Sequence, residues 1–153
     1  MLEILTPLTK VERVSRQIDS ATFVAAPGIW AQIQEDGSLL NVVETTNALI
    51  NKLVIGSASL NQYESHDIEV GRITTMESFG VRCKVDSEGF TGTPTQGEFL
   101  IVSSAAKTLG KLAPLSDGVS KATYEIVARC EEIDSTNSIM VFRTISPTVV
   151  TMA

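Results

Sequence analysis

The sequence is poor in the side chains on which most enzymes and metal sites depend. It contains one histidine, His66, and two cysteines, Cys83 and Cys130, which form no C-x-x-C motif. General acid–base catalysis needs a histidine or paired carboxylates, and nucleophilic catalysis needs a serine or cysteine beside a base. We recognise no such constellation, so we expect no catalytic activity and no cofactor.

His66 lies among carboxylates at residues 64–69, which raises the question of a metal site. No second histidine or thiolate stands near it, and the spacing fits no known site. We therefore expect a solvated acidic loop and no bound metal, and leave the role of this loop open. Cys83 and Cys130 are expected to be buried thiols in a reducing compartment, while a disulfide between them stays an alternative.

The chain also lacks an extended cluster of basic residues and any long apolar run. Its formal net charge is −6, and its Lys and Arg residues are scattered except for Lys10, Arg13 and Arg16. A nucleic-acid partner would require basic residues on one face, so none is expected. No run is long enough to span a membrane, and the first residues do not resemble a secretory signal.

Period-two alternation is the strongest pattern that the sequence does contain. Residues 123–132 and 138–146 alternate in part and are separated by five residues of turn-forming character, which predicts a β-hairpin. In this hairpin we expect Tyr124, Ile126 and Ala128 to share one face, with Cys130 in phase.

Other segments carry the same signal. An Asp36-Gly37 turn predicts a hairpin of residues 29–34 and 39–43, and residues 69–75 and 79–86 look like another pair. Further strands are expected at residues 22–26, 52–57 and 148–152, the last as a short strand of its own. The sum is a mostly-β single domain of about eight to ten strands, built as a barrel or sandwich.

Residues 1–20 form a segment of different character, which we separate from the β-rich domain at residues 21–153. Thr9 to Glu12 matches a capping box, and apolar residues then recur at helical spacing, which predicts a helix packed on the domain. The competing interpretation is an arm that engages a neighbouring subunit. Its apolar and basic residues would make the contacts: Leu2, Ile4, Leu5, Leu8, Val11, Arg13 and Arg16.

Four short motifs carry a family resemblance. They are GEFLIV at residues 97–102, GKLAP at 110–114, YEIVAR at 124–129 and IMVFR at 139–143. Together they resemble the head decoration (cement) proteins of tailed bacteriophages, over residues 97–147 above all. The resemblance implies a β-tulip-like domain with an N-terminal arm. It also implies a homotrimer that binds the major capsid protein on the exterior of the virion, after synthesis in the host cytoplasm.

Two further residues are candidates for partner contacts. Trp30 falls on the polar face of its strand, where either packing or a subunit interface would explain it. Phe90 lies in a glycine-rich stretch that reads as an exposed loop, and such loops often carry contacts. Two alternatives to a decoration protein remain: another β-rich phage assembly protein, such as a tail-tube or neck protein, and a small-ligand-binding β-barrel.

Overall fold

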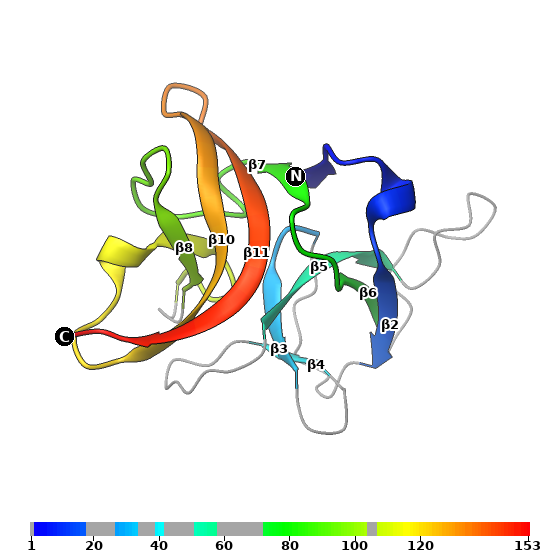
Figure 1. Cartoon of the computed structure of the whole chain (residues 1–153), viewed down its shortest axis with the longest axis horizontal. Helices are drawn as coiled ribbons and strands as arrows, with labels where there is room; N and C mark the ends of the chain where they lie inside the picture. Colours follow the sequence, from blue (N-terminus) through cyan, green and yellow to red (C-terminus); the bar gives the residue numbers. More distant parts are fainter. Residues whose placement is uncertain (1, 18–26, 34–38, 42–50, 58–71, 104–106) are drawn as a thin grey trace.

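The computed structural model describes residues 2–17, 27–33, 39–41, 51–57, 72–103 and 107–153. These residues form two antiparallel sheets and two short 3₁₀ turns, so the expected mostly-β fold is confirmed (Figure 1). The described strands do not close into a barrel.

The larger sheet has six strands in the order β1-β7-β11-β10-β8-β9, and the smaller has five in the order β2-β6-β5-β3-β4. The six-stranded sheet contains β1 (Leu2–Ile4), β7 (Arg82–Val85), β8 (Phe99–Val102), β9 (Leu112–Pro114), β10 (Thr123–Asp134) and β11 (Ile139–Thr151). The five-stranded sheet contains β2 (Arg13–Gln17), β3 (Trp30–Ile33), β4 (Leu39–Asn41), β5 (Asn51–Ser57) and β6 (Arg72–Met76). The 3₁₀ turns are η1 (Leu8–Lys10) and η2 (Leu115–Asp117).

One apolar core joins the two sheets. Its members come from the strands and loops of both, and removal of this surface from water is the main force that holds the sheets together. We call the side of the six-stranded sheet that contributes to this core its inner face, and the opposite side its outer face. The buried core residues are Val11, Trp30, Leu53, Met76, Val81, Cys83, Val85, Phe90, Leu100, Val102, Leu112, Val127, Ala128, Cys130, Met140 and Phe142.

The predicted hairpin of β10 and β11 is confirmed, but the predicted face of β10 is wrong. The register with β11 shifts between Ile126 and Ala128, as it does with β8. Such a bulge places two successive side chains on one side of the sheet. Ala128 and Cys130 therefore lie in the main core, whereas Tyr124 and Ile126 lie in a separate cluster on the outer face.

Strand β11 runs through Pro147 without ending. Ile126 pairs with Thr148 and Ala128 with Thr144, so β11 has two extra residues in this interval. Pro147 lies within that irregular interval, where a missing N–H does not break the ladder of hydrogen bonds. Residues 148–151 are thus the end of β11 and not the separate strand that the sequence predicted.

The expected pairing of residues 69–75 with 79–86 is also wrong. β6 pairs with β2 and β5 in the five-stranded sheet, while β7 pairs with β1 and β11 in the other sheet. The residues between them, 77–81, cross from one sheet to the other. This connection has the length of a hairpin turn, but it crosses from one sheet to the other. The alternation of apolar and polar residues does not distinguish these two cases.

The N-terminal segment contributes a strand to each sheet. β1 pairs with β7 at one edge of the six-stranded sheet, and β2 pairs with β6 at one edge of the other. The predicted helix is not formed in residues 2–17; the only helical turn there is η1, three residues long. The pairing of β1 with β7 and of β2 with β6 therefore determines the conformation of this segment, although its apolar residues recur at helical spacing.

Several predicted features fall outside the described residues: the strand at residues 22–26, the Asp36-Gly37 turn and the loop with His66. Cys83 and Cys130 are both buried and free. Each is paired in register with Phe142, from opposite sides, so β11 lies between them. Two strand spacings amount to about 9.5 Å, which is beyond the Cα separation that a disulfide spans. Burial raises the pKa of the Cys83 thiol to about 12, which keeps it protonated.

Candidate functional site

A second apolar cluster occupies the outer face of the six-stranded sheet. We call it the outer cluster. Its buried members are Ile101, Ala113, Tyr124 and Ile126, and the half-buried Leu115, Ala122, Ile145, Val150 and Met152 pack against them. All of these residues belong to the six-stranded sheet or to the segments that adjoin it, and none belongs to the described strands of the five-stranded sheet.

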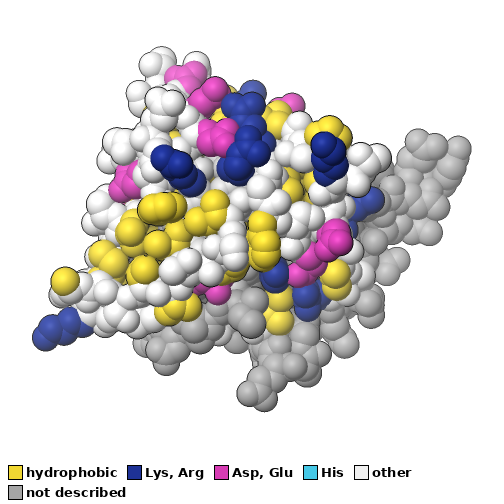
Figure 2. Space-filling model, viewed as in Figure 1, with side chains coloured by type: hydrophobic (Ala, Val, Ile, Leu, Met, Phe, Trp, Pro, Cys, Tyr) yellow, Lys and Arg dark blue, Asp and Glu magenta, His cyan; other side chains and the backbone are white. Residues whose placement is uncertain are grey.

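Phe99 extends the outer cluster to solvent. It pairs with Arg129 across β8 and β10, and directly opposed residues in an antiparallel pair point to the same side, so Phe99 lies on the outer face. Its side chain is 45% exposed. Figure 2 shows hydrophobic side chains gathered on this face, below a group of basic and acidic ones. Exposed apolar surface marks protein-interaction sites, and on this face Phe99 and the half-buried members of the outer cluster supply it.

The charged group lies on the same face of the same strands. Glu131 accepts hydrogen bonds from Arg82, at 2.7 Å, and from Arg143. The hydrogen bond from Arg143, together with that from Arg82 and their charges, holds the pKa of Glu131 below its usual value despite some burial. Arg82 also contacts Glu132 at 3.2 Å. The outer face is therefore divided into an apolar half and a half of paired charges.

A shallow depression of about 550 Å³ lies on the outer face. Arg129 stands where the apolar half of the outer face meets the charged half, and its Nε donates a hydrogen bond to the carbonyl oxygen of Gly97 at 3.0 Å. The lining residues are Gln96, Gly97, Arg129, Cys130, Glu131, Glu132, Arg143 and Ile145. This open shape suits contact with another protein surface better than enclosure of a small molecule.

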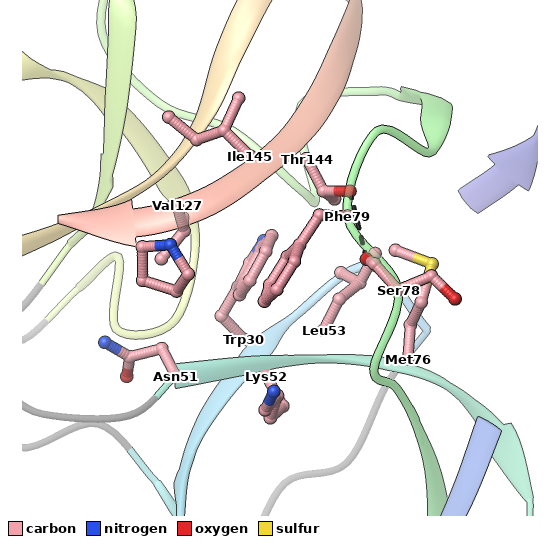
Figure 3. Close-up of a pocket in the computed structure, with 11 residues that line it drawn as sticks. Trp30, Asn51, Lys52, Leu53, Met76, Ser78, Phe79, Val127, Thr144 and Ile145 are labelled. Carbon is pink, nitrogen blue, oxygen red and sulfur yellow. Dashed lines mark hydrogen bonds between the residues drawn. The ribbon is translucent and has the colours of Figure 1, made fainter. Parts of the chain in front are cut away.

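A different site lies between the two sheets, beneath Phe79 (Figure 3). Its floor consists of buried residues from both sheets, and its rim contains the exposed Phe79 and Pro147. The pocket is partly open to solvent, and its volume of about 20 Å³ admits a single water-sized group. The lining residues are Trp30, Asn51, Lys52, Leu53, Met76, Ser78, Phe79, Val127, Thr144, Ile145 and Pro147. We call this site the intersheet pocket.

Trp30 lines the intersheet pocket, and its indole nitrogen is buried beside that pocket. The residue is 5% exposed, and its Nε1 is, among the described residues, the one buried side-chain nitrogen or oxygen without a hydrogen-bond partner. Its polar neighbours are engaged. Ser78 Oγ accepts from the backbone N–H of Glu12 at 2.5 Å, and Thr144 Oγ1 donates to the carbonyl of Ser78 at 3.2 Å. The indole N–H is thus a donor held in place without an acceptor.

An ion triad supports the rim of this pocket. Glu77 contacts Arg16 at 2.7 Å and Lys52 at 2.8 Å, and each of these side chains is at most 17% exposed. Burial by itself raises the pKa of Glu77, but hydrogen bonds from Lys52 and Arg16 and their charges outweigh it, so the net pKa is lowered. Lys52 Nζ also lies 5.8 Å from the centre of the Phe79 ring, a cation–π distance.

Glu125 forms a polar link between the sheets near the pocket. It is 5% exposed, and Oε1 accepts a hydrogen bond from the backbone N–H of Asn51 at 3.0 Å. Burial raises its pKa, and the hydrogen bonds from Asn51 and the charge of Lys52 offset this only in part. Glu125 therefore links β10 to the start of β5 through a carboxyl group whose ionised form is disfavoured by burial.

The structure separates the predicted partner-binding residues into two groups. Leu2 and Ile4 pack against the main core, and Val11, Trp30 and Phe90 are buried in it. Arg16 belongs to the triad with Glu77. Leu5, Leu8 and Arg13 are exposed. Three of the nine candidates are therefore available on the surface, and all three belong to the N-terminal segment.

Sequence reasoning did not single out Phe79 as a contact residue or recognise the outer cluster as a surface. Phe79 is 53% exposed, although it opens what reads as a strand. The outer cluster depends on the bulge after Ile126, which turns Tyr124 and Ile126 away from the core. A charged Glu125 between two apolar residues was the available signal that the buried face changes at this point of β10.

Comparisons of the chain with models of protein families and with curated proteins found no match. In the described part of the chain, no three His, Cys, Asp or Glu side chains gather in a way that would hold a metal ion. The helical turns described are far too short to cross a membrane.

Proposed function

We propose that this chain is a structural protein that decorates a bacteriophage head and holds neighbouring major capsid proteins together. The observation that carries the proposal is the outer face of the six-stranded sheet. Its apolar half belongs largely to residues 97–147, the stretch that resembles phage decoration proteins. The two lines of support, the motif resemblance and an apolar face with the exposed Phe99, thus meet on one part of the molecule.

In this proposal the outer cluster and Phe99 form the contact between copies in a homotrimer. An interface between copies has an apolar centre with a polar rim, and the outer face offers both, since the paired charges of Arg82, Glu131 and Arg143 adjoin the cluster. Phe99 is the residue through which the apolar half reaches solvent.

The N-terminal segment would provide the attachment to the capsid. Leu8 is 55% exposed and Leu5 38% exposed, and Arg13 adds a positive charge to an otherwise acidic chain. Since β1 and β2 are held by the two sheets, these residues form a fixed surface and need no ordering on binding, which favours affinity. The domain itself would be β-tulip-like, with the two sheets that share one core as its sandwich or opened barrel.

Two point substitutions test the two surfaces separately. Phe99→Lys should change the mass in solution from three chains to one, measured by light scattering at micromolar concentration. Leu8→Lys should keep the trimer mass and abolish co-sedimentation with expanded heads that lack their decoration. Each variant is the control for the other, and both should retain the circular dichroism and melting temperature of the unaltered chain.

Other outcomes would contradict the proposal. A single-chain mass for the unaltered protein would remove the trimer, and rings or tubes in negative-stain micrographs would favour a tail-tube or neck protein. If both variants bound heads as strongly as the unaltered protein does, neither surface would be needed for attachment. A small-ligand-binding barrel finds little support, because the pocket that the described residues form between the sheets has a volume of about 20 Å³, whereas ligand pockets measure about 300–1,000 Å³.

A further inference from the structure

A row of side chains crosses the outer face of the six-stranded sheet from β8 to β7. Phe99 is paired in register with Arg129, and Arg129 with Arg143. Arg143 is paired in turn with Arg82. Directly opposed residues of antiparallel strands point to the same side, with their Cα atoms within about 5.5 Å. Three positive charges therefore stand next to one another, which is unfavourable unless negative charges compensate them.

The arginine next to Phe99 is the one that lacks a counter-charge. Arg82 and Arg143 both form ion pairs with Glu131. Arg129 has no carboxylate partner among the described residues, and its Nε is bonded to a backbone carbonyl group. Its exposed side chain borders the shallow depression on this face. Arg129 therefore presents an uncompensated positive charge beside the exposed ring of Phe99.

The opposite combination lies at the margin of the same sheet. η2 follows the edge strand β9. Its Asp117 is exposed, and the carboxylate has no hydrogen-bond or ion-pair partner in the described part of the chain. Two residues further on, Val119 is 64% exposed, more than any other large apolar side chain that the structure describes. Figure 1 shows this segment, in yellow, on the side of the sheet away from the five-stranded sheet.

The two combinations match in spacing and have opposite charges. Phe99 and Arg129 are directly opposed, which sets their Cα atoms about 4.5–5.5 Å apart. Gly118, between Asp117 and Val119, has extended backbone angles, and two residues of extended chain span about 6–7 Å. Within one chain Asp117 and Arg129 form no ion pair, although both are described. Each combination is thus left without the other in the single chain.

We propose that the homotrimer contact pairs Asp117 of each copy with Arg129 of the next copy. In the same contact Val119 packs on the exposed ring of Phe99. A second copy suits the site because this chain carries both complementary patches, and a contact between two different patches of identical subunits can repeat around a closed ring. An arginine fork can hold a carboxylate through two hydrogen bonds, which fixes the register of the contact. The inference rests on the proposed function and assigns residues to its trimer contact.

Charge reversal tests this pairing. Asp117→Arg and Arg129→Asp should each raise at least tenfold the concentration at which half of the trimer dissociates, measured by sedimentation equilibrium of the full chain. The double variant restores the pair with its charges exchanged, and its dissociation concentration should return to within threefold of that of the unaltered protein. Val119→Ala should raise this concentration at least threefold, because it removes apolar contact with the phenylalanine ring.

Matched charge reversals on the N-terminal segment control for the change in net charge. Glu12→Arg and Arg13→Asp alter exposed residues that lie outside the six-stranded sheet, and both should leave the dissociation concentration unchanged. Circular dichroism of every variant checks that the fold is retained. If one single variant does not fold, comparison of the other single variant with the double variant still decides the matter.

The inference is overturned if a folded single charge-reversal variant at Asp117 or Arg129 leaves the trimer as stable as before. It is also overturned if the double variant dissociates as readily as the single variants, or if the N-terminal reversals weaken the trimer equally. In each of these cases the trimer itself remains, and so does the proposed function. A single-chain mass for the unaltered protein at micromolar concentration would instead contradict the proposed function, and this inference with it.

Discussion

The two faces of the six-stranded sheet are built from the same strands but have different environments. The inner face is closed by the five-stranded sheet, and its side chains Leu100, Met140 and Phe142 are fully buried. The outer face has no described strand of the other sheet over it, and it is divided into the outer cluster and a group of paired charges. The inner face forms the core that the two sheets share, whereas the outer face leaves Phe99 exposed to solvent.

A single irregularity in β10 accounts for much of this difference. Before the bulge, Tyr124 and Ile126 point outward and Glu125 points toward the other sheet; after it, Ala128 and Cys130 point inward. Without the bulge, one side of β10 would carry all four of the nonpolar residues. The bulge thus moves apolar surface to the outer face at a small cost in pairing.

The inner face should be the most sensitive to truncation. Phe142→Ala removes a fully buried ring from the shared core, and we expect a loss of about 3–5 kcal/mol in the free energy of unfolding. Urea denaturation followed by circular dichroism would measure it. A loss below about 1 kcal/mol would mean that the core between the sheets is not closely packed.

Ile126→Ala is the corresponding change on the outer face. Ile126 is 7% exposed, but the half-buried residues around it can relax toward solvent, so we expect about 2 kcal/mol, the low end for such truncations. The same denaturation experiment applies, at a concentration where the chain is monomeric. An effect as large as that of Phe142→Ala would show that the outer cluster is a second closed core.

Glu125 provides a smaller, pH-dependent effect on the inner face. Its pKa is raised, mainly by burial, so the folded chain binds this proton more tightly than the unfolded chain does. The unaltered protein should therefore lose stability as the pH rises from about 4.3, the pKa of a glutamate in an unfolded chain, through the raised pKa of Glu125 in the folded chain. Glu125→Gln should lack this loss, because the amide oxygen still accepts from Asn51 and carries no charge.

Denaturation of both proteins at pH 4 and pH 7 tests the Glu125 prediction. The stability of the unaltered protein relative to Glu125→Gln should be higher at pH 4 than at pH 7. Equal differences at the two pH values would contradict the raised pKa. Glu131→Gln, described next, serves as a control for the general effect of removing one negative charge.

Glu131 should give the smallest effect. Its ion pairs with Arg82 and Arg143 lie on the outer face, where its side chain is 26% exposed, so Glu131→Gln should cost less than about 1 kcal/mol. The difference from the unaltered protein should shrink further in 1 M salt, which screens such pairs. A cost of about 3 kcal/mol that salt does not change would show that this half of the face is effectively buried.

Much of the strand content was predictable from the sequence. The hairpin of β10 and β11, the pairing of β3 with β4 and the strand β5 all follow from alternation and turn residues, because one buried face imposes period two on the sequence. These predictions depend only on local chemistry, and the structure confirms them.

Features that depend on distant pairing were not predictable in this way. The choice of partner strands for β6 and β7, the bulge in β10 and the strand conformation of residues 13–17 are set by contacts far along the chain. Of the candidate contact residues, Trp30 and Phe90 are buried, whereas Phe79 is exposed. Alternation indicates that a strand has two sides, but it does not identify which side faces the core.

The position of the N-terminal strands has a consequence for the order of folding. β1 pairs with residues 83–85 and β2 with residues 72–76, so residues 2–4 and 13–17 acquire their partner strands only after the ribosome has made residues 72–85. Contacts of such high sequence separation slow folding, because a long loop must be closed before it is stabilised. During that interval Leu2, Ile4 and Val11 have no core to enter. The rate of folding should therefore respond more to substitutions in the partner strands β6 and β7 than to changes in β1 itself.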